Sequence, residues 1–407
     1  MSPDNYYKSQ LNWLFSQFPN YQKQGNSAYK PGLQNTNKLL SIFGDPHKHL
    51  KHIHVAGTNG KGSVCAYMAS MLTEKKERVG LFTSPHLWDF RERIRINGKK
   101  ISKKFIIDFC KKIQSTALDF NPSFFEITFV MAMSYFMELN CSICVIETGM
   151  GGRLDATNTI TPILSIITNI GIDHVEFLGT NLETIAEEKA GIIKQNTPIL
   201  IGQKQEKIEH VFSNKAIQHK SQLYLSSDSN IQHEKLDIDY KKKNFDTALS
   251  GMNIINIIYN DRVVQNALDN LEKNTGLQGR FQKIQSDPEV YIDVAHNLDG
   301  IINVLSRFSK DKDLHIIYGS SKEKNYKEII RFLTQKHTVA LSQFKNERSL
   351  TKEDLDLLHK EFPNISNTYV DVNLALREIL NNSVGNTKIL ICGSFFLIAD
   401  LKIEEAN

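Results

Sequence analysis

The run from Ile53 to Ser63 constrains this chain more than any other part of it. It reads Ile-His-Val-Ala-Gly-Thr-Asn-Gly-Lys-Gly-Ser, a short apolar strand that enters a turn with three glycines and one lysine. A helical stretch, 63–76, follows the turn. Glycines let backbone N–H groups approach an anion, a helix N-terminus adds positive potential, and Lys61 adds a full charge. The run therefore predicts a phosphate-binding loop.

This loop departs from the standard phosphate-binding pattern. The standard pattern places four residues between its two glycines, and a serine or threonine directly after the lysine. Here Gly57 precedes Lys61 by only four positions, and Gly62 separates the lysine from Ser63. A plain glycine-rich turn is the alternative. We favour phosphate binding because strand, loop, lysine, hydroxyl and helix all occur in order, and Ser63 can offer its hydroxyl to Mg²⁺.

Strand-like and helix-like segments alternate along most of the chain, which indicates an α/β protein with mostly parallel sheets. The predicted strands are 53–57, 79–83, 143–148, 163–168, 198–202, 290–294, 314–318, 337–341 and 388–392. The predicted helices are 63–76, 103–117, 125–139, 182–194, 325–335, 352–361 and 372–381. Several strands are continuous apolar runs, as expected for strands that are covered on both faces.

The chain is long for a single core, with 407 residues, and a fresh strand begins after Gly279-Arg280-Phe281. We expect an N-terminal ATPase domain of the P-loop type over 1–281 and a smaller Rossmann-like α/β domain over 282–407. Ligands of such proteins commonly bind between domains, so we expect the active site in the interdomain cleft. The polar stretch 203–250 has short strands, and we expect it to be peripheral.

Composition excludes several other classes of protein. The net charge of +4 is mild, and the lysine clusters lack the interleaved aromatic residues of a nucleic-acid site. No run of 18 apolar residues predicts a membrane span, and residues 1–8 lack the apolar core of a signal peptide. The five cysteines are odd in number and lie in apolar segments, which favours reduced thiols in a cytoplasmic protein. Cys141 and Cys144 are expected to be buried thiols, with a metal or redox pair as the alternative.

Three other strands end in polar side chains, at the sheet edge where doubly wound folds bind ligands. Ser84 follows 79–83 and suits Mg²⁺, although a Ser-Pro turn explains it equally well. Glu147 ends a buried strand, where a carboxylate is costly unless it is paired or bound to metal. His174 appears at the same edge, which favours a functional over a structural histidine. These positions predict a metal or substrate site.

Two further segments flank that edge. A glycine-rich loop after Glu147 carries Arg153 and Asp155, and we expect it to move. Lys189 stands on a helix after the His174 loop, behind two acidic neighbours. Its local sequence favours a solvated charge cluster.

Taken together, these segments resemble the Mur ligase superfamily, and within it folylpolyglutamate synthase and dihydrofolate synthase of the bacterial bifunctional type. The resemblance covers about residues 10–400. The matching motifs are Gly57 to Ser63, Ser84-Pro85-His86, Glu147 to Asn158, Asp173-His174, Glu188 to Gly191, Gly279-Arg280-Phe281 and Asp293 to Asn297. Muramyl ligases usually carry a threonine pair after the lysine, so Gly62-Ser63 favours the folate branch.

The resemblance implies roles for particular residues. ATP phosphates are expected on Asn59, Gly60, Lys61, Gly62 and Ser63. One Mg²⁺ is expected on Ser84 and Glu147. A second is expected on His174 and on Lys189, which is carbamylated in this family, so the resemblance overrules the solvated reading of Lys189. Lys61, Lys189 and His296 are the expected catalytic groups, with Arg280 and Asp293 on the nucleotide.

The resemblance also implies a pterin site on the helix start formed by Ser123, Phe124, Phe125 and Glu126, covered by Leu154. Core packing is the alternative for Phe124 and Phe125.

Three positions depart from the family pattern. Gln278 replaces a proline before Gly279-Arg280, and Glu323-Lys324-Asn325 replaces an Asp-Lys-Asp motif. The adenine-contacting asparagine normally starts an alanine-rich helix. Asn256 is the first candidate, with Asn253 behind it, although little helix is expected before Asp261.

The implied reaction is an ATP-dependent amide ligation through an acyl phosphate, in which L-glutamate is added to dihydropteroate and to reduced folates. Alternatives are a folate chain extender only, a muramyl-type ligase, or a nucleotide-binding regulator that hydrolyses ATP or GTP. The resemblance implies a cytoplasmic monomer without nucleic-acid or membrane partners.

Overall fold

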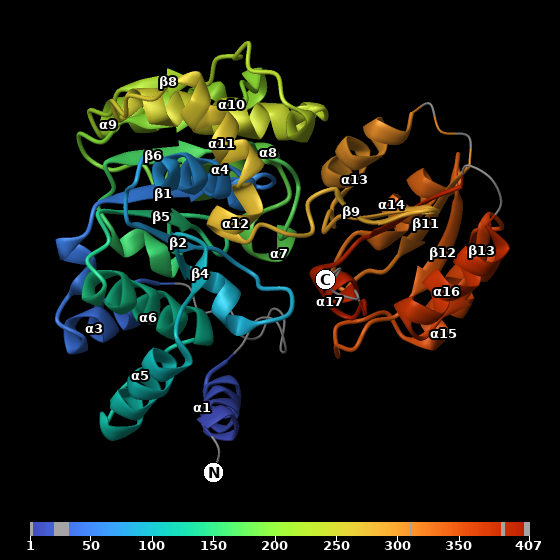
Figure 1. The fold of residues 1–407 in the computed structure, drawn as a ribbon, viewed down its shortest axis with the longest axis horizontal. Coiled ribbons are helices and arrows are strands. Elements are labelled where there is room, and N and C mark those ends of the chain that lie inside the picture. The colour runs from blue at the N-terminus through green and yellow to red at the C-terminus, as the bar shows by residue number, and fades with distance from the viewer. Residues whose placement is uncertain (1–2, 20–31, 310, 312, 384–386, 403–407) are drawn as a thin grey trace. The chain divides into compact units, whose positions relative to one another are not determined.

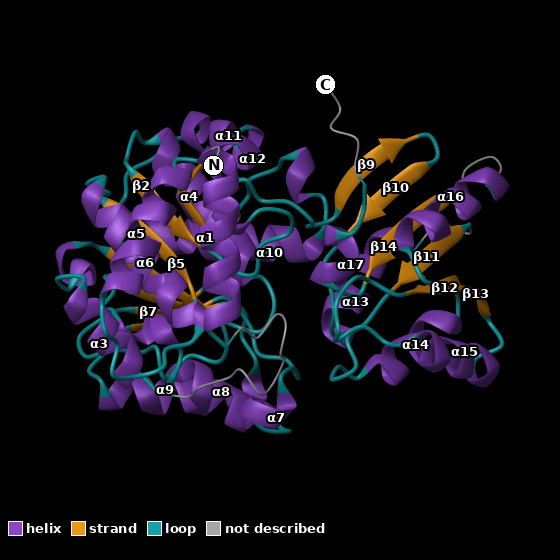
Figure 2. Ribbon diagram, turned by 90° about the horizontal axis from the view of Figure 1, so that it is seen from below, coloured by secondary structure: helices purple, strands orange, loops and turns teal. Residues whose placement is uncertain are grey.

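The computed structural model describes residues 3–19, 32–309, 311, 313–383 and 387–402. Residues 1–2 of the polar N-terminal stretch lie outside these ranges. The chain forms two compact units, Met1–Leu277 and Gln278–Asn407. Each unit is an α/β layer structure in which helices lie beside a mostly parallel sheet (Figures 1 and 2), as the alternating sequence pattern predicts.

The first unit is built on an eight-stranded sheet with the order β4-β3-β2-β5-β1-β6-β7-β8. Its strands are β1 (His52–Ala56), β2 (Val79–Phe82), β3 (Ile94–Ile96), β4 (Lys99–Lys100), β5 (Ile143–Glu147), β6 (Leu164–Ile167), β7 (Ile199–Ile201) and β8 (Leu223–Leu225). Only the β2–β3 and β3–β4 pairs are antiparallel. Strands β1 and β5 are buried along their whole length, as expected for strands covered on both faces, although β1 includes two histidines.

Helices cover both faces of this sheet. They are α1 (Pro3–Gln17), α3 (Gln34–Ile42), α4 (Lys61–Glu74), α5 (Lys103–Ser115), α6 (Phe124–Glu138), α7 (Val175–Leu178), α8 (Leu182–Ala190), α9 (Glu209–Gln218), α10 (Asp239–Ile254), α11 (Asp261–Asp269) and α12 (Leu271–Thr275). One core joins α4 and α10 to Ile53 and Val55 of β1. A second core on the opposite face joins α3, α5 and α6 to β5.

The expectation that 203–250 is peripheral is wrong for its C-terminal part. Helix α10 packs against α4, and Phe245, Ala248 and Met252 lie in the core. The expectation of little helix between Asn256 and Asp261 is confirmed, because α10 ends at Ile254 and α11 begins at Asp261. Asn256 lies beyond the end of α10 and is exposed. It therefore does not start a helix.

The second unit has a six-stranded sheet with the order β13-β12-β11-β14-β10-β9, in which only β9 and β10 are antiparallel. Its elements are β9 (Gln282–Ser286), β10 (Glu289–Ile292), α13 (Leu298–Leu305), β11 (Leu314–Tyr318), α14 (Tyr326–Thr334), β12 (Thr338–Ser342), α15 (Lys352–Glu361), β13 (Ile365–Tyr369), α16 (Val372–Asn382), β14 (Lys388–Cys392) and α17 (Phe395–Ala399).

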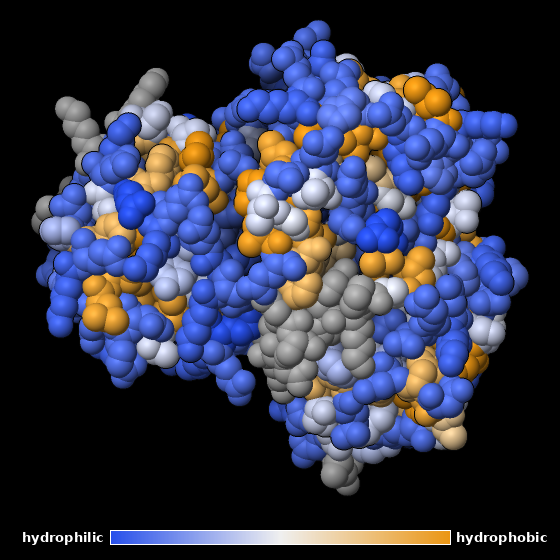
Figure 3. All heavy atoms as spheres, turned by 180° about the vertical axis from the view of Figure 1, so that it is seen from behind, coloured by the Kyte–Doolittle hydropathy of each residue, from blue (hydrophilic) through white to orange (hydrophobic). Residues whose placement is uncertain are grey.

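The surface and the thiols agree with the composition. Apolar side chains reach the surface as patches among polar ones (Figure 3). Among the described residues, no helix combines the length and the apolar character that crossing a membrane would require. All five cysteines are buried free thiols, which confirms the prediction for Cys141 and Cys144.

Candidate active site

The loop between β1 and α4 is held by the segment that follows β6. The Thr58 amide donates to the Asn169 carbonyl at 2.8 Å, and the Asn59 amide donates to the Asn169 side chain at 2.9 Å. Thr168 Oγ1 donates to the Asn59 carbonyl at 2.6 Å. Gly57 is required at the loop start, because a Cβ there would lie 1.9 Å from Thr168 Oγ1. The loop is therefore fixed in shape by two neighbouring strand ends.

Helix α4 begins at Lys61, two residues earlier than the sequence predicts. The amides of Lys61, Gly62 and Ser63 thus occupy the first turn, where no carbonyl of a preceding turn is available. Ser63 is buried, and Lys61 folds back so that Nζ donates to the carbonyls of Gly57 and Thr58, both at 3.1 Å. The loop therefore presents helix-terminal N–H groups and one cation, which is a site for an anion.

Lys189 reaches the same loop. It is only 4% exposed, and its Nζ donates to the Gly57 carbonyl at 2.8 Å. Lys61 and Lys189 thus share one acceptor. Burial, and next the charge of Lys61, lower the pKa of Lys189 to about 7. The solvated position that its local sequence suggests is wrong.

Glu147 lies between the loop and the end of β2. It is 4% exposed and accepts a hydrogen bond from the Ser84 amide at 3.0 Å. A Cβ at Gly62 would lie 3.4 Å from Glu147 Oε2, an ordinary contact distance, so the start of α4 lies beside this carboxylate. The structure thus brings Ser84, Glu147 and the phosphate-type loop together at one sheet edge.

The described residues contain no group of three His, Cys, Asp or Glu side chains that could bind a metal ion. Mg²⁺ usually keeps several waters and binds through one or two carboxylates together with substrate phosphates. A single buried carboxylate, Glu147, beside a serine and an anion-binding loop fits that donor set. The site residues are therefore compatible with a metal ion that arrives with phosphate.

His174 and Asp173 lie at the edge after β6. The His174 amide donates to Asp173 Oδ1 at 2.8 Å, and the His174 Nε2 lies 3.8 Å from Asp173 Oδ2. Asp173 is buried, and its charge acts to raise the pKa of Lys189 against the larger effect of burial. His174 and Lys189 therefore belong to one neighbourhood.

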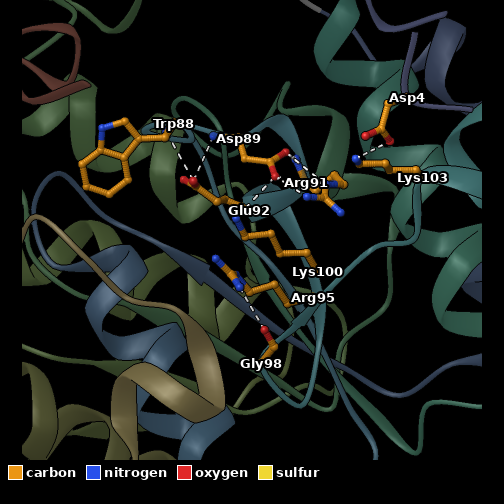
Figure 4. Close-up of polar contacts among 9 residues, drawn as sticks. All are labelled: Asp4, Trp88, Asp89, Arg91, Glu92, Arg95, Gly98, Lys100 and Lys103. Atoms are coloured by element: carbon orange, nitrogen blue, oxygen red, sulfur yellow. Dashed lines mark hydrogen bonds and ion pairs between the residues drawn. The ribbon is translucent and has the colours of Figure 1, made fainter. Parts of the chain in front are cut away.

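The segment after β2 contains two residues, Glu92 and Arg93, that the sequence pattern does not single out. Glu92 accepts the Leu87 amide at 2.8 Å. It also accepts the amides of Trp88 and Asp89, and Asp89 binds Arg91 (Figure 4). These contacts shape the segment that carries Ser84.

Arg93, at the end of this segment, is buried, and its Nε donates to His86 Nδ1 at 2.8 Å. Burial lowers the pKa of Arg93 to about 10, against the opposing charge of Glu147. Arg93 therefore places a buried positive charge near His86 and Glu147, which its local sequence does not indicate.

Asn244 is a third residue that the sequence analysis does not single out. It lies on α10, is buried, and its Oδ1 would be 2.3 Å from a Cβ at Gly60. The signal was present in the sequence, because Phe245, Ala248 and Met252 follow at helical spacing. Asn244, and not Asn256, is the asparagine that lies on a helix beside the loop.

The proposed pterin segment forms the start of α6. Ser123 and Glu126 make a reciprocal capping box, and Glu126 also accepts from Thr36 at 3.1 Å. Phe124 is buried and stacks on Phe15. These three side chains are thus already engaged in packing and capping.

Phe125 and Leu154 differ from them, because both are partly exposed. A Cβ at Gly149 would lie 2.6 Å from the Phe125 ring, so Phe125 borders the glycine-rich loop.

In the second unit, Arg280, Asp293 and His296 lie near one another. Asp293 accepts the amides of Phe281 and Ala295, each at 2.7 Å. The Arg280 guanidinium lies 5.1 Å from the centre of the Phe395 ring, and His296 lies 6.1 Å from it. Since a carbonyl only accepts, the contact between His296 Nδ1 and the Val294 carbonyl places the proton on Nδ1.

Comparison with known proteins defines the class. A family model described as "Mur ligase middle domain" matches residues 55–283, and one described as "Mur ligase, glutamate ligase domain" matches 279–395. These are the two domains of an ATP-dependent ligase of the Mur type.

Individual relatives refine this class. The dihydrofolate synthase/folylpolyglutamate synthase of Bacillus subtilis is 31% identical over 92% of this chain and 94% of its own. A Haloferax volcanii protein, "Probable bifunctional folylpolyglutamate synthase/dihydropteroate synthase", is 28% identical over 92% of this chain, which spans only 48% of that protein. The structure of folylpolyglutamate synthase from Thermotoga maritima matches with a TM-score of 0.79 and 28% identity, covering 97% of this chain and 96% of that one. The chain belongs to the dihydrofolate synthase/folylpolyglutamate synthase family of Mur ligases.

Proposed function

We propose that this protein is an ATP-dependent ligase that attaches L-glutamate to dihydropteroate and to reduced folates. The observation that carries the proposal is the convergence of Lys61 and Lys189 on one carbonyl of the phosphate-type loop, with Glu147 and Ser84 beside it. A second support is family membership.

The reaction divides into two steps. A carboxylate oxygen of the pterin substrate attacks the γ-phosphorus of ATP, the bond to the β-phosphate oxygen breaks, and ADP leaves. The amine of glutamate then attacks the carbonyl carbon of the acyl phosphate. The amide bond forms, phosphate leaves, and the nitrogen loses its extra protons.

The chain contributes charge neutralisation and positioning to the first step. The loop residues Asn59 to Ser63 bind the phosphates, and Lys61 turns from its carbonyl acceptors to the transferred group. Such preorganised charges dominate phosphoryl transfer, which needs little covalent help from the protein. Asn244 replaces Asn256 as our candidate for the adenine contact because it lies beside Gly60.

Bound Mg²⁺ would neutralise the negative charge that develops on the phosphoryl oxygens. Glu147 and Ser84 would hold one ion. His174 and a carbamylated Lys189 would hold the second.

The pKa of about 7 at Lys189 supports its carbamylation. A neutral amine is the nucleophile, and near neutral pH a large share of Lys189 is neutral. Its Nζ attacks CO₂, a nitrogen–carbon bond forms, and one proton is released. The product is an anion beside Lys61, so the repulsion between two neighbouring cations is replaced by attraction.

For the pterin we propose Phe125 and Leu154 as direct contacts, with Ser123, Phe124 and Glu126 forming the wall behind them. In the second unit we propose that Arg280 and Asp293 serve the nucleotide and His296 the reacting phosphate. We also propose a monomer in the cytoplasm, since five buried free thiols suit a reducing compartment.

The test is product formation from ATP and L-glutamate with dihydropteroate or tetrahydrofolate as acceptor. Activity with both supports the bifunctional enzyme, and activity with tetrahydrofolate alone supports a chain extender. Ligation that requires a muramyl peptide, or ATP turnover that needs neither acceptor nor glutamate, overturns the proposal.

A further inference from the structure

A buried chain of hydrogen bonds joins the central strand β1 to the glycine-rich loop 149–158. His54 is completely buried on β1, and its Nε2 lies 2.8 Å from Thr157 Oγ1. Thr157 Oγ1 donates to Asp155 Oδ1 at 2.5 Å. The other oxygen of Asp155 accepts the Met150 amide at 2.8 Å. The chain therefore runs from the strand that leads into the phosphate loop to the start of a second loop.

The direction of these bonds fixes the state of the imidazole. A hydroxyl has one proton. Because Thr157 donates it to Asp155, the Thr157 oxygen accepts a hydrogen bond from His54. The proton of the neutral ring thus sits on Nε2. The buried Nδ1 has no hydrogen-bond partner among the described residues. Burial lowers the pKa of His54 well below its usual value, which keeps the ring neutral.

The loop that this chain holds lies between two parts of the candidate site. At one end, Gly149 borders the Phe125 ring. Further along, a Cβ at Gly152 would lie 2.9 Å from the Lys189 carbonyl, and the Arg153 amide donates to the Glu188 carbonyl at 2.7 Å. A displacement of loop 149–158 would therefore change the separation between Phe125 and Lys189.

We infer that His54 is a positioning residue, which holds the loop 149–158 through Thr157 and Asp155 so that Phe125 and Lys189 keep their separation. The kinetic part of this inference rests on the proposed ligase function. His54 touches none of the reacting groups itself, so its removal acts only through the loop.

The chain offers a matched control in His52. It lies two residues earlier on β1, so it points to the same face of the sheet, and it is 1% exposed. Both its ring nitrogens are buried without hydrogen-bond partners among the described residues. His52→Leu and His54→Leu therefore make the same change in the same strand, but only the second removes a contact to the loop.

The first experiment compares His54→Leu, His54→Gln and His52→Leu. For His54→Leu we expect kcat/KM for dihydropteroate to fall about tenfold while KM for ATP stays within about twofold, because the phosphate loop is held independently by Thr168 and Asn169. The amide of glutamine can donate from the position of Nε2, so His54→Gln restores most of the activity. His52→Leu stays near wild type. Equal losses in the two leucine variants, or no rescue by glutamine, overturn the inference.

The second experiment needs no enzymatic activity. Hydrogen–deuterium exchange of peptides that cover 149–158 is expected to be about two- to tenfold faster in His54→Leu than in the wild type or His52→Leu. Unchanged exchange overturns the inference. If His54→Leu does not fold, Thr157→Val removes both the acceptor for His54 and the donor to Asp155 while it keeps the side-chain shape, and a loss of kcat/KM and faster exchange of 149–158 are expected of it. An inactive wild type with the expected exchange pattern refutes the proposed function and leaves the positioning role standing.

Discussion

Replacing Gly60 by alanine tests whether the phosphate loop and Asn244 form one nucleotide site. Gly60 has φ of 86°, and a Cβ there would lie 2.3 Å from Asn244 Oδ1 and 2.9 Å from Asn244 Cγ. The left-handed conformation costs an L-residue roughly 1–2 kcal/mol. An alanine Cβ at this short distance would push the Asn244 side chain away from the loop. The variant therefore combines backbone strain with a displaced side chain.

Gly44→Ala separates the two effects. Gly44 has nearly the same φ, 80°, but a Cβ there would meet no atom within 4 Å. We expect each variant to lose about 1–2 kcal/mol of unfolding free energy from backbone strain. Gly60→Ala alone is expected to lose about tenfold in ATP affinity, which corresponds to about 1.4 kcal/mol.

Urea unfolding measures the first quantity, and calorimetric titration with a non-hydrolysable ATP analogue measures the second. Wild-type affinity in Gly60→Ala would show that Asn244 takes no part in nucleotide binding. An equal loss of affinity in Gly44→Ala would show that general destabilisation, and not the contact with Asn244, weakens binding.

Three further variants test single parts of the site. Lys61→Ala should reduce kcat by at least about 10²–10³, measured as pterin-dependent ADP release, and near wild-type turnover would remove Lys61 from the mechanism. Burial lowers the pKa of Lys189 to about 7, whereas in the unfolded chain this pKa has the usual value for lysine. Between these two pH values the unfolded chain binds more protons than the folded protein, so the free energy of unfolding rises with pH. In urea unfolding without CO₂, the wild type should gain about 2 kcal/mol over Lys189→Met between about pH 7 and pH 8.5, and parallel pH profiles would contradict this. Phe125→Leu should raise KM for dihydropteroate several-fold without changing KM for ATP, whereas Phe124→Leu, in the aromatic core, should mainly lower the unfolding temperature; the reverse pattern would exchange their roles.

The sequence predicted those parts of the fold that depend on local patterns. Strand β5 is an almost wholly apolar run, and β1 alternates two histidines with apolar residues; the structure places both within a residue of the predicted ends. The phosphate-type loop was likewise readable, since glycines, lysine and helix start follow one another directly.

Helix α10 was missed although its core positions Phe245, Ala248, Leu249 and Met252 follow the helical period. Its first turns are rich in lysine and aspartate and hide that period. The burial of Lys189 and Arg93 could not be predicted from the residues next to them in the sequence. Lys189 is buried because Gly152 packs closely over the end of α8, and Arg93 is buried against Phe124. Both contacts join segments that are far apart in the chain.

The central claim is that ATP is spent to join glutamate to a pterin carboxylate. The most direct measurement uses dihydropteroate with ¹⁸O in its carboxylate, together with ATP and L-glutamate. An acyl phosphate intermediate predicts that one ¹⁸O appears in the released inorganic phosphate for each amide formed. Phosphate without ¹⁸O, or phosphate release that is independent of glutamate and pterin, would contradict the account.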